Sequence, residues 1–377
     1  MKNVLITGGA GFIGSNLAIK LVQRGYNVTI IDNLSVQIHG IEPEKTSNLY
    51  NSIKDKVKFI RGSVTNRTDM TKALQSQDIV IHFAAETGTG QSMYCIEKYV
   101  NVNIGGTALM LDILANSKHN IKKIIIASSR SIYGEGKYSN SKGVYVYPSN
   151  RLNENMLNGN FNVSYENDFN LTLVPTDENS KIHPSSVYGI TKQNQEQMVM
   201  TVCPTIGIIP VSFRYQNVYG PGQSLSNPYT GILSIFSTQI RNGNAIEIFE
   251  DGNESRDFVF IDDVVSATCL GIENTKANGE IFNVGSGVPI SVLKVANALV
   301  KSYNIDVPIS VSGKFRLGDI RHNYACLSKI NNLLGFVPQI SFDEGIKRFT
   351  SWVLSQKIEK DNLVHSLEEM RNKGLLK

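Results

Sequence analysis

The chain has 377 residues, of which 41% are apolar and 19% charged, and its formal net charge is +4. These values are typical of a globular protein, and the absence of a Lys/Arg block argues against a nucleic-acid or membrane-surface partner. Four widely spaced cysteines, without a C-x-x-C pair, are expected to be reduced thiols rather than disulfides or metal ligands. No segment resembles a signal peptide or a membrane span, so we expect a soluble, cytoplasmic protein.

The first fourteen residues predict a turn that binds a dinucleotide. The apolar strand of residues 4–7 runs directly into Gly8-Gly9-Ala10-Gly11-Phe12-Ile13-Gly14, and an amphipathic helix is expected at residues 15–24. Gly8 and Gly11 let the backbone approach a pyrophosphate, Gly14 lets the helix pack on the strand, and the helix N-terminus offers free amides to the anion. The alternative is a glycine-rich turn that binds no nucleotide.

A second strand, residues 27–31, ends in Asp32, and this order of elements strengthens the prediction. A carboxylate at this place hydrogen-bonds the adenosine ribose and repels a 2′-phosphate. The cofactor is therefore expected to be NAD rather than NADP.

Apolar strand-like runs alternate with helical patterns through the first half of the chain. The further strands are expected at residues 57–60, 79–83, 124–128 and 208–213. Such alternation predicts an α/β fold with a Rossmann-type, doubly wound parallel sheet. Beyond residue 216 the pattern changes, so we predict a cofactor domain over residues 1–216 and a smaller C-terminal α/β lobe over residues 217–377.

Two segments depart from this alternation. Residues 136–181 contain ten asparagines and little periodicity. They are interpreted as an insertion, either a substrate lid or an asparagine-rich surface loop. Residues 359–377 carry apolar side chains at helical spacing and are expected to form a docking helix.

The pair Tyr188 and Lys192 indicates acid–base chemistry. A spacing of four places the phenol and the ammonium on one face of a helix, where the ammonium lowers the pKa of the phenol. Alone, such a pair is usually a surface tyrosine and a solvated lysine. Here a predicted central strand ends in Ser128-Ser129, at the edge of the sheet where ligands bind.

Taken together, these segments resemble the extended short-chain dehydrogenase/reductases, in the branch that acts on nucleotide-diphosphate sugars. The matching motifs are residues 7–14, His82-Phe83-Ala84-Ala85, residues 128–134, Tyr188-x-x-x-Lys192, and residues 214–222 and 256–263. The resemblance covers nearly the whole chain. Residues 86–94, 134–138 and 227–231 are also similar to the bacterial dTDP-L-rhamnose 4-epimerases.

The resemblance implies a role for each matching residue near the reacting carbon. Tyr188 would be the acid/base, Lys192 would hold the nicotinamide ribose, and Ser129 would hydrogen-bond the reacting oxygen. The residues implied to bind NAD are Gly8, Gly11, Phe12, Ile13, Gly14, Asp32, Ala84, Ala85, Tyr188 and Lys192. His82 is expected to be a satisfied histidine at a strand end, since no proton is supplied for it to move.

The substrate implied by the resemblance is a dTDP- or UDP-linked sugar. Arg256 and Arg316 match positions that contact the diphosphate, for which guanidinium groups are well suited, while surface salt bridges are the alternative. Asn217 matches a diphosphate or sugar contact, and Asp319 a nucleotide-ribose ligand. The base is expected near residues 229–236 and 246–249.

The reaction is inferred from what the motif lacks. A 4,6-dehydratase of this family carries Asp-Glu directly after its serine or threonine, where this chain has Arg130 and Ser131. The sequence therefore favours a C4 epimerase that retains NAD, with dTDP-L-rhamnose and dTDP-6-deoxy-L-talose as the expected pair. A nucleotide-sugar reductase, dehydrogenase or C2 epimerase, and a non-enzymatic NAD-binding sensor, are the alternatives.

Members of this family commonly form dimers through two helices of each subunit. Here the corresponding stretches are residues 106–116 and 188–202, and both are apolar enough for a homodimer interface. Packing against the protein's own core would explain the same pattern.

Overall fold

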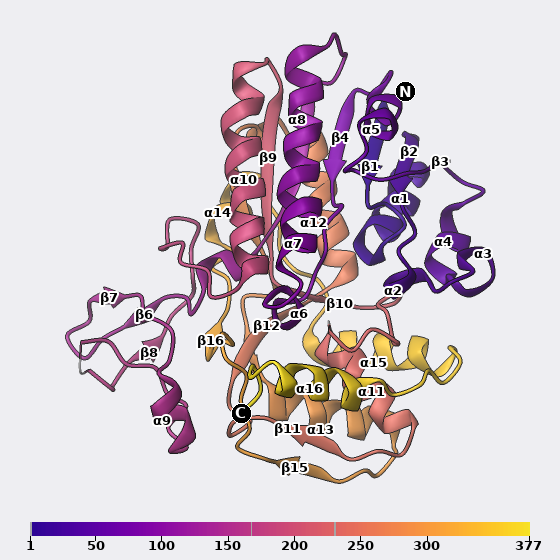
Figure 1. Cartoon of the computed structure of the whole chain (residues 1–377). Helices are drawn as coiled ribbons and strands as arrows, with labels where there is room; N and C mark the ends of the chain where they lie inside the picture. The colour runs from indigo at the N-terminus through magenta and orange to yellow at the C-terminus, as the bar shows by residue number, and fades with distance from the viewer. Residues whose placement is uncertain (1, 167, 230) are drawn as a thin grey trace.

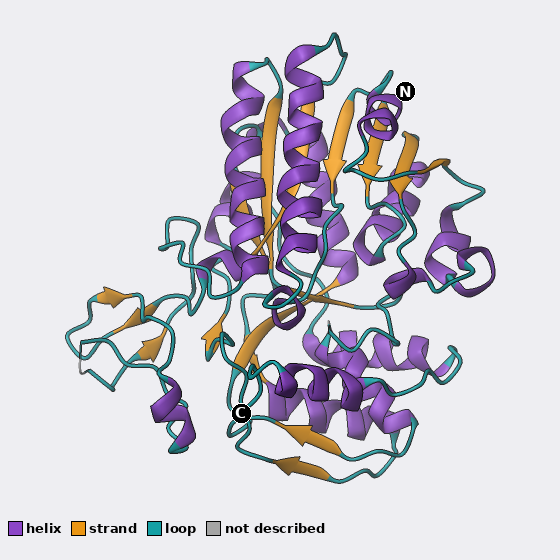
Figure 2. Ribbon diagram, in the orientation of Figure 1, coloured by secondary structure: helices purple, strands orange, loops and turns teal. Residues whose placement is uncertain are grey.

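A seven-stranded parallel sheet forms the upper half of the molecule in Figures 1 and 2, in the order β13-β9-β5-β4-β1-β2-β3. The computed structural model describes residues 2–166, 168–229 and 231–377. The strands are β1 (Asn3–Thr7), β2 (Asn27–Asp32), β3 (Lys58–Arg61), β4 (Ile79–His82), β5 (Lys123–Ser129), β9 (Ile209–Tyr215) and β13 (Ile281–Val284). The strand order reverses between β1 and β4, so a crevice opens at their carboxyl ends. The predicted Rossmann-type α/β fold is confirmed.

Both faces of this sheet are buried, which explains the continuous apolar runs in its strands. Val4 and Ile6 of β1 pack in the core that also holds helices α1 (Phe12–Gln23) and α12 (Ile261–Glu273). Leu5 points to the opposite core, beside helices α5 (Arg67–Leu74), α8 (Gly106–Asn116) and α10 (Val187–Thr205). Each fully buried aliphatic side chain stabilises the fold by about 1.5–3 kcal/mol.

The six strands predicted from the sequence all occur within two residues of the expected bounds. The seventh, β13, was not predicted, and it pairs with β9 from within the range assigned to the second lobe. Helix α12 also returns to this layer and packs on α1. The two parts of the molecule are therefore discontinuous in sequence, and the boundary at residue 217 stays a prediction.

The C-terminal lobe lies below the sheet in Figure 1. Its strands are β10 (Asn217–Tyr219), β11 (Ile246–Ile248), β12 (Ser255–Phe260), β14 (Pro289–Ser291), β15 (Ile309–Val311) and β16 (His322–Asn323). Its helices are α11 (Ile232–Arg241), α13 (Val292–Tyr303), α15 (Phe342–Leu354) and α16 (Leu363–Asn372). One apolar core runs from α1 and α12 into α11, α13 and α15, so the lobe is joined to the sheet by packing.

The remaining elements are short. They are α2 (Val36–His39), α3 (Pro43–Thr46), α4 (Asn48–Ile53), α6 (Thr89–Ser92), α7 (Ile96–Tyr99), the π-helical turn η1 (Val100–Gly105), the 3₁₀ turns η2 (Arg130–Tyr133) and η3 (Thr275–Ala277), and α14 (Ser328–Leu334). The docking helix expected near the C-terminus is confirmed as α16, which buries Met370. After it, the main chain of residues 375–377 pairs with that of residues 315–317.

The insertion at residues 136–181 forms regular structure of its own and projects to the left in Figure 1. It contains the antiparallel sheet β7-β6-β8, with β6 (Tyr138–Ser139), β7 (Tyr145–Val146) and β8 (Thr172–Leu173), and helix α9 (Asn153–Leu157). Tyr138, Val146 and Val163 form a small core beneath this sheet. Strands of two residues leave too little periodicity to be read from a sequence.

A buried ion pair fastens this insertion to the C-terminal lobe. Both terminal nitrogens of Arg151 donate to the Glu250 carboxylate at 2.7 Å, and both side chains are at most 5% exposed. Arg151 also donates to the Asp319 carbonyl at 2.9 Å. Nearby, Met156 and Phe161 pack against Phe315. The insertion thus supports the loop that carries Arg316 and Asp319.

Replacing Arg151 with Ala is expected to lower the free energy of unfolding by about 3 kcal/mol, because it leaves the buried Glu250 with one weaker partner, Arg321 at 3.1 Å. Arg67 is the matched control, since its pair with Asp112 is more than half exposed and is worth about 0–1 kcal/mol. Urea unfolding of the two alanine variants measures both effects. Equal losses would contradict the anchoring role of Arg151.

Candidate active site

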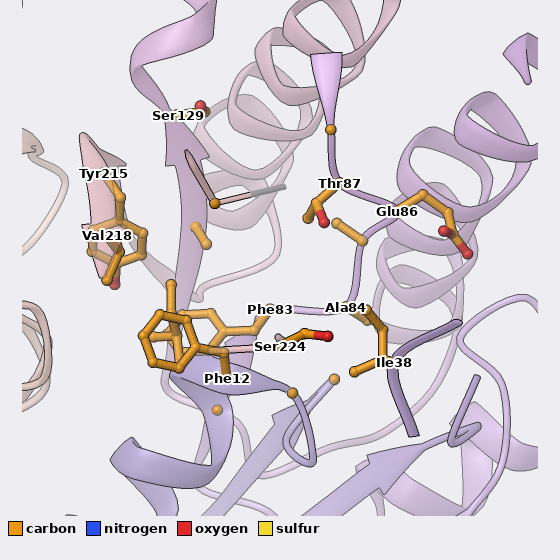
Figure 3. A pocket seen from close by; sticks show the side chains of 18 of the residues that line it. Phe12, Ile38, Phe83, Ala84, Glu86, Thr87, Ser129, Tyr215, Val218 and Ser224 are labelled. Carbon is orange, nitrogen blue, oxygen red and sulfur yellow. The ribbon is translucent and has the colours of Figure 1, made fainter. Parts of the chain in front are cut away.

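A cleft of about 470 Å³ opens at the carboxyl ends of β1, β2, β4 and β5. Figure 3 looks into this cleft, with Phe12, Ala84 and Ser129 among its labelled lining residues. All predicted cofactor and catalytic residues line it, together with two of the predicted substrate residues, Ser129 and Asn217. The predicted residues in the cleft are Gly8, Gly11, Phe12, Ile13, Gly14, Asp32, Ala84, Ala85, Ser129, Tyr188, Lys192 and Asn217. Among the described residues, none between 136 and 181 lines this cleft, so the insertion does not cover it.

The glycine turn packs too closely for side chains. Gly8 has φ +66°, and a Cβ there would lie 2.7 Å from the Ala84 backbone. A Cβ on Gly14 would lie 2.7 Å from the Gly8 carbonyl oxygen. At Gly11, a Cβ would meet only that same oxygen, at 3.3 Å, so the free space there belongs to the cleft. Gly11 is also the N-cap of α1 and offers no side-chain cap, which leaves room for an anion at the helix N-terminus.

Asp32 lies at the end of β2, as the sequence predicted. Its carboxylate accepts the amide protons of Ala10 at 3.0 Å and Leu34 at 2.9 Å. Burial raises its pKa, while these hydrogen bonds and the His39 ring, 3.9 Å away, oppose the change. The carboxylate is thereby oriented beside the glycine turn, where it fits a ribose of NAD.

Tyr188 lies at the start of α10, whose N-cap Ser186 accepts the Gly189 amide proton. The Tyr188 amide donates to Ser92 Oγ at 3.0 Å, which fixes the start of the helix against α6. Burial raises the pKa of the Tyr188 phenol, whereas hydrogen bonding with Ser129 and the positive charge of Arg130 lower it. The cleft therefore holds a phenol beside a hydroxyl and a cation.

A line of buried hydrogen bonds supports Lys192 from behind. Its amine donates to the Ala127 carbonyl at 2.8 Å and to Gln195 Oε1 at 2.9 Å. Gln195 donates to the Thr107 hydroxyl at 2.8 Å. A third N–H of Lys192 is left for the cleft, and burial lowers the pKa of the amine to about 7.

His82 continues this line of hydrogen bonds. Its ring lies between the Thr7 hydroxyl, 2.8 Å from Nδ1, and the Thr107 hydroxyl, 3.0 Å from Nε2. Because Thr107 donates its own proton to the Asn103 carbonyl, we assign the His82 proton to Nε2. Burial and the charge of Lys192 lower the pKa of His82 to about 3, so the ring is neutral, as predicted for a satisfied strand-end histidine.

The predicted substrate residues are not all in the main cleft. Asn217 lines it and accepts a hydrogen bond from Arg130. Arg316 and Asp319 lie instead in a small adjoining pocket, beside Met370 of α16. Arg256 lines neither pocket, because its guanidinium donates to the carbonyls of Ser255, Ile320 and Arg321.

Of the two segments expected near the base, residues 229–236 reach the rim of the main cleft, whereas residues 246–249 do not line it. Tyr229 and Leu233 line it, and Arg316 stacks 4.9 Å from the ring centre of Phe249. Thr230, in the same segment, lies outside the described residues. Tyr229 donates to Glu369 of α16 at 2.6 Å, so the C-terminal helix is tied to this rim.

The described residues contain no group of three or more His, Cys, Asp or Glu side chains arranged to hold a metal ion. In the same part of the chain, no helix has the length and apolarity needed to cross a membrane.

Comparisons with known proteins agree with the class of protein that this fold and cleft define, an enzyme that uses a nicotinamide dinucleotide. A model of the NAD dependent epimerase/dehydratase family matches residues 4–151 and 165–285. The dTDP-L-rhamnose 4-epimerase of Burkholderia thailandensis is 36% identical over 366 residues, which cover 96% of this chain and 97% of that protein.

Two solved structures are also similar. The UDP-glucuronic acid 4-epimerase of Bacillus cereus, in complex with UDP-glucuronic acid and NAD, is 26% identical with a TM-score of 0.75, covering 93% of this chain and 99% of that chain. The UDP-glucose 4-epimerase of Thermotoga maritima, with UDP-glucose, is 28% identical with a TM-score of 0.74, covering 93% and 98%.

The chain therefore belongs to the NAD dependent epimerase/dehydratase family. The predictions of an enzyme and of NAD as its cofactor are confirmed by these relatives. The cradle of Gly8, Gly11 and Gly14 beside Asp32 fits that cofactor, and it leaves space at the helix N-terminus for the pyrophosphate.

Sequence reasoning missed three residues of the cleft and its support. Arg130 was considered only as the replacement of a dehydratase carboxylate, although it lines the cleft beside Asn217. His39, beside Asp32, comes from a four-residue helix that carries no sequence signal. Gln195 lies three residues after Lys192 on α10, and this spacing could have identified it.

The buried neutral His82 predicts a loss of stability in acid. An unfolded histidine binds a proton below about pH 6.5, whereas folded His82 does so only near pH 3, so the unfolded state gains protons first as the pH falls. The free energy of unfolding should fall from pH 6.5 downward, with a slope approaching about 1.4 kcal/mol per pH unit from this residue.

Urea unfolding of the parent and of His82→Asn between pH 7.5 and 4 measures this contribution. The variant is expected to be less stable at pH 7.5 but to lose stability less steeply below pH 6.5. Equal slopes in the two proteins would contradict a neutral, buried His82.

Proposed function

We propose that this protein inverts C4 of a nucleotide-diphosphate sugar through a 4-keto intermediate, and that it converts dTDP-L-rhamnose to dTDP-6-deoxy-L-talose. The observation that carries the proposal is the single cleft that brings Ser129, Tyr188 and Lys192 together beside the glycine turn. Oxidation of a carbinol needs a base, a donor to the reacting oxygen and an aligned hydride acceptor.

NAD, when bound, accepts a hydride from the sugar and returns it. In the proposal, Tyr188 takes the proton of the C4 hydroxyl during oxidation and gives it back after the sugar has turned. Ser129 donates a hydrogen bond to the reacting oxygen, and the third N–H of Lys192 holds the nicotinamide ribose. The line of hydrogen bonds from Lys192 through Gln195 and Thr107 to His82 fixes the position of the Lys192 amine.

The residues after Ser129 favour epimerisation over dehydration. Elimination of water needs an additional acid and base beside the sugar. Arg130 supplies a guanidinium, which does not lose its proton in proteins, and Ser131 uses its amide to hold Ser129 Oγ at 3.1 Å. Neither side chain offers a carboxylate to the sugar.

The choice of dTDP-L-rhamnose rests on the Burkholderia relative, which is named a dTDP-L-rhamnose 4-epimerase and matches nearly the whole chain. The UDP-sugar epimerases of known structure make UDP-linked sugars the second class to test.

Incubating the protein with NAD and dTDP-L-rhamnose, and following the sugar protons by NMR together with NADH absorbance, tests the proposal. The 6-deoxy-talose product without net NADH is expected; net NADH would indicate a dehydrogenase, and inversion at C2 a C2 epimerase.

Replacing Tyr188 with Phe is expected to lower kcat by several orders of magnitude while leaving NAD binding intact, because only the acid/base oxygen is removed. Tyr99→Phe is the matched control. Its ring lies 6.5 Å from that of Tyr188, but its hydroxyl donates to the Thr87 carbonyl and has no role in the reaction. Turnover of Tyr188→Phe within tenfold of the parent would refute the catalytic assignment.

The proposal includes a cytoplasmic homodimer. Helices α8 and α10 lie side by side on one face of the molecule, and Ile190 of α10 is 45% exposed there (Figure 1). All four cysteines are free, as suits a reducing compartment.

Sedimentation at micromolar concentration is expected to give a dimer for the parent and a monomer for Ile190→Glu, whereas a monomeric parent would refute the interface.

A further inference from the structure

Arg130 is a desolvated cation without an anionic partner. It follows Ser129 in the turn η2 and lines the main cleft, and its Nε donates to Asn217 Oδ1 at 3.1 Å. No carboxylate oxygen of the described residues lies within 4.0 Å of its guanidinium. Burial lowers the pKa of this group to about 9. Arg130 is half-buried and has no acidic partner in the described part of the chain, so it has capacity for an anionic ligand.

The positive charge of the Arg256 guanidinium also acts on Arg130. Arg256 is the charged residue that most strongly destabilises the cationic form of Arg130. It is 9% exposed, uses three of its five donors on backbone carbonyls, and also lacks a carboxylate within 4.0 Å among the described residues. The positive charge of Arg256 therefore adds to the benefit of an anion bound beside Arg130.

The Arg130 side chain contacts the C-terminal lobe through Asn217. After Arg256, the charged groups that act on it most are Asp319 and then Tyr188. Its contact with Asn217, the first residue of β10, shows that the side chain spans from the sheet to that lobe. Its Nε therefore lies beside Asn217, a residue that matches a diphosphate or sugar contact of the family.

The cleft offers little other positive charge to an anionic substrate. Among its described lining residues, Arg130 is the one arginine and Lys192 the one lysine. The Lys192 amine already donates to Ala127 and Gln195, on the cofactor side. Arg130 is therefore the arginine that the described lining of this cleft offers to the phosphates of a substrate.

We propose that Arg130 binds the sugar-proximal phosphate of the substrate diphosphate. This inference rests on the proposed function, which supplies a nucleotide-diphosphate sugar as the substrate. A guanidinium binds phosphate oxygens through paired, charge-assisted hydrogen bonds. Anchoring the phosphate leaves the sugar ring free to turn between the two hydride transfers.

Isothermal titration of the NAD-loaded protein with dTDP and with dTMP tests the assignment, because dTMP lacks the outer phosphate. Arg130→Gln is expected to bind dTDP about 10- to 100-fold more weakly than the parent, as for the loss of a charged hydrogen-bond pair. Its affinity for dTMP and for NAD should stay within threefold. Arg67→Gln, an exposed arginine, should change none of these values.

Unchanged dTDP affinity in Arg130→Gln would overturn the proposal. A raised KM for the nucleotide sugar with unchanged dTDP affinity would likewise overturn it, and would assign Arg130 to the sugar. An equal loss for dTDP and dTMP would also contradict it, since the outer phosphate would then not be the partner.

A purely structural role is tested by thermal unfolding without ligand. Removing an unpaired, half-buried cation is expected to leave the Tm of Arg130→Met equal to or above that of the parent, while a given concentration of dTDP raises it less than in the parent. A large fall in Tm would contradict the proposal. Arg130→Lys keeps the charge and the fold but loses the paired geometry, and it should bind dTDP with intermediate affinity.

The same titration separates this inference from the proposed function. If the parent binds neither dTDP nor UDP, the nucleotide-sugar substrate and the Arg130 assignment both fail. If the parent binds dTDP and Arg130→Gln does not, the assignment stands even where no C4 inversion is detected by NMR.

Discussion

The close approach of two backbones, at Gly8 and Ala84, is the constraint on which the rest of the site depends. β1 and β4 are neighbours in the sheet, and the chain leaves them in turns that touch with no room for a Cβ on Gly8. This contact brings the first helix to the mouth of the crevice, with an uncapped N-terminus at Gly11. Asp32 then reaches the same opening from the next strand. A side chain larger than hydrogen at Gly8 would separate β1 from β4 and displace all of these groups together.

Behind the cleft, four elements are joined by one line of hydrogen bonds. Lys192 and Gln195 come from α10, Thr107 from α8, His82 from β4 and Thr7 from β1. Every proton in this line has one consistent donor when His82 carries its proton on Nε2. A charged imidazole would add a second cation near Lys192 in a buried setting. The neutral His82 ring therefore has a positioning role. It helps to hold the Lys192 amine in place and adds no second charge beside it.

The sequence was most informative where one physical requirement restricts the residue type. Glycines in a tight turn, a carboxylate after the second strand, and the spacing of Tyr188 and Lys192 predicted residues that the structure brings together in one cleft. The strands of the sheet were equally predictable, since burial on both faces demands long apolar runs. β13 was not, because a four-residue strand that contains Asn283 has no distinctive period and returns to the sheet from a distant segment. Arg256 shows the limit for side chains: a motif gives the residue but not whether its donors are already used by the backbone.

The insertion and the C-terminal segment both hold the loop that carries Arg316 and Asp319. Arg151 of the insertion is fully paired with Glu250, and its remaining contacts hold the Asp319 carbonyl and the Phe161 carbonyl. From the other side, the main chain of residues 375–377 pairs with residues 315–317. The loop that carries Arg316 and Asp319 is thus held by two segments that lie outside the sheet and its crossover helices. Inside the cleft the pattern reverses, because Arg130 has no acidic partner among the described residues. Paired arginines hold this loop in place, and an unpaired one is kept for the ligand, so the same residue type stabilises the fold in one place and costs stability for binding in the other.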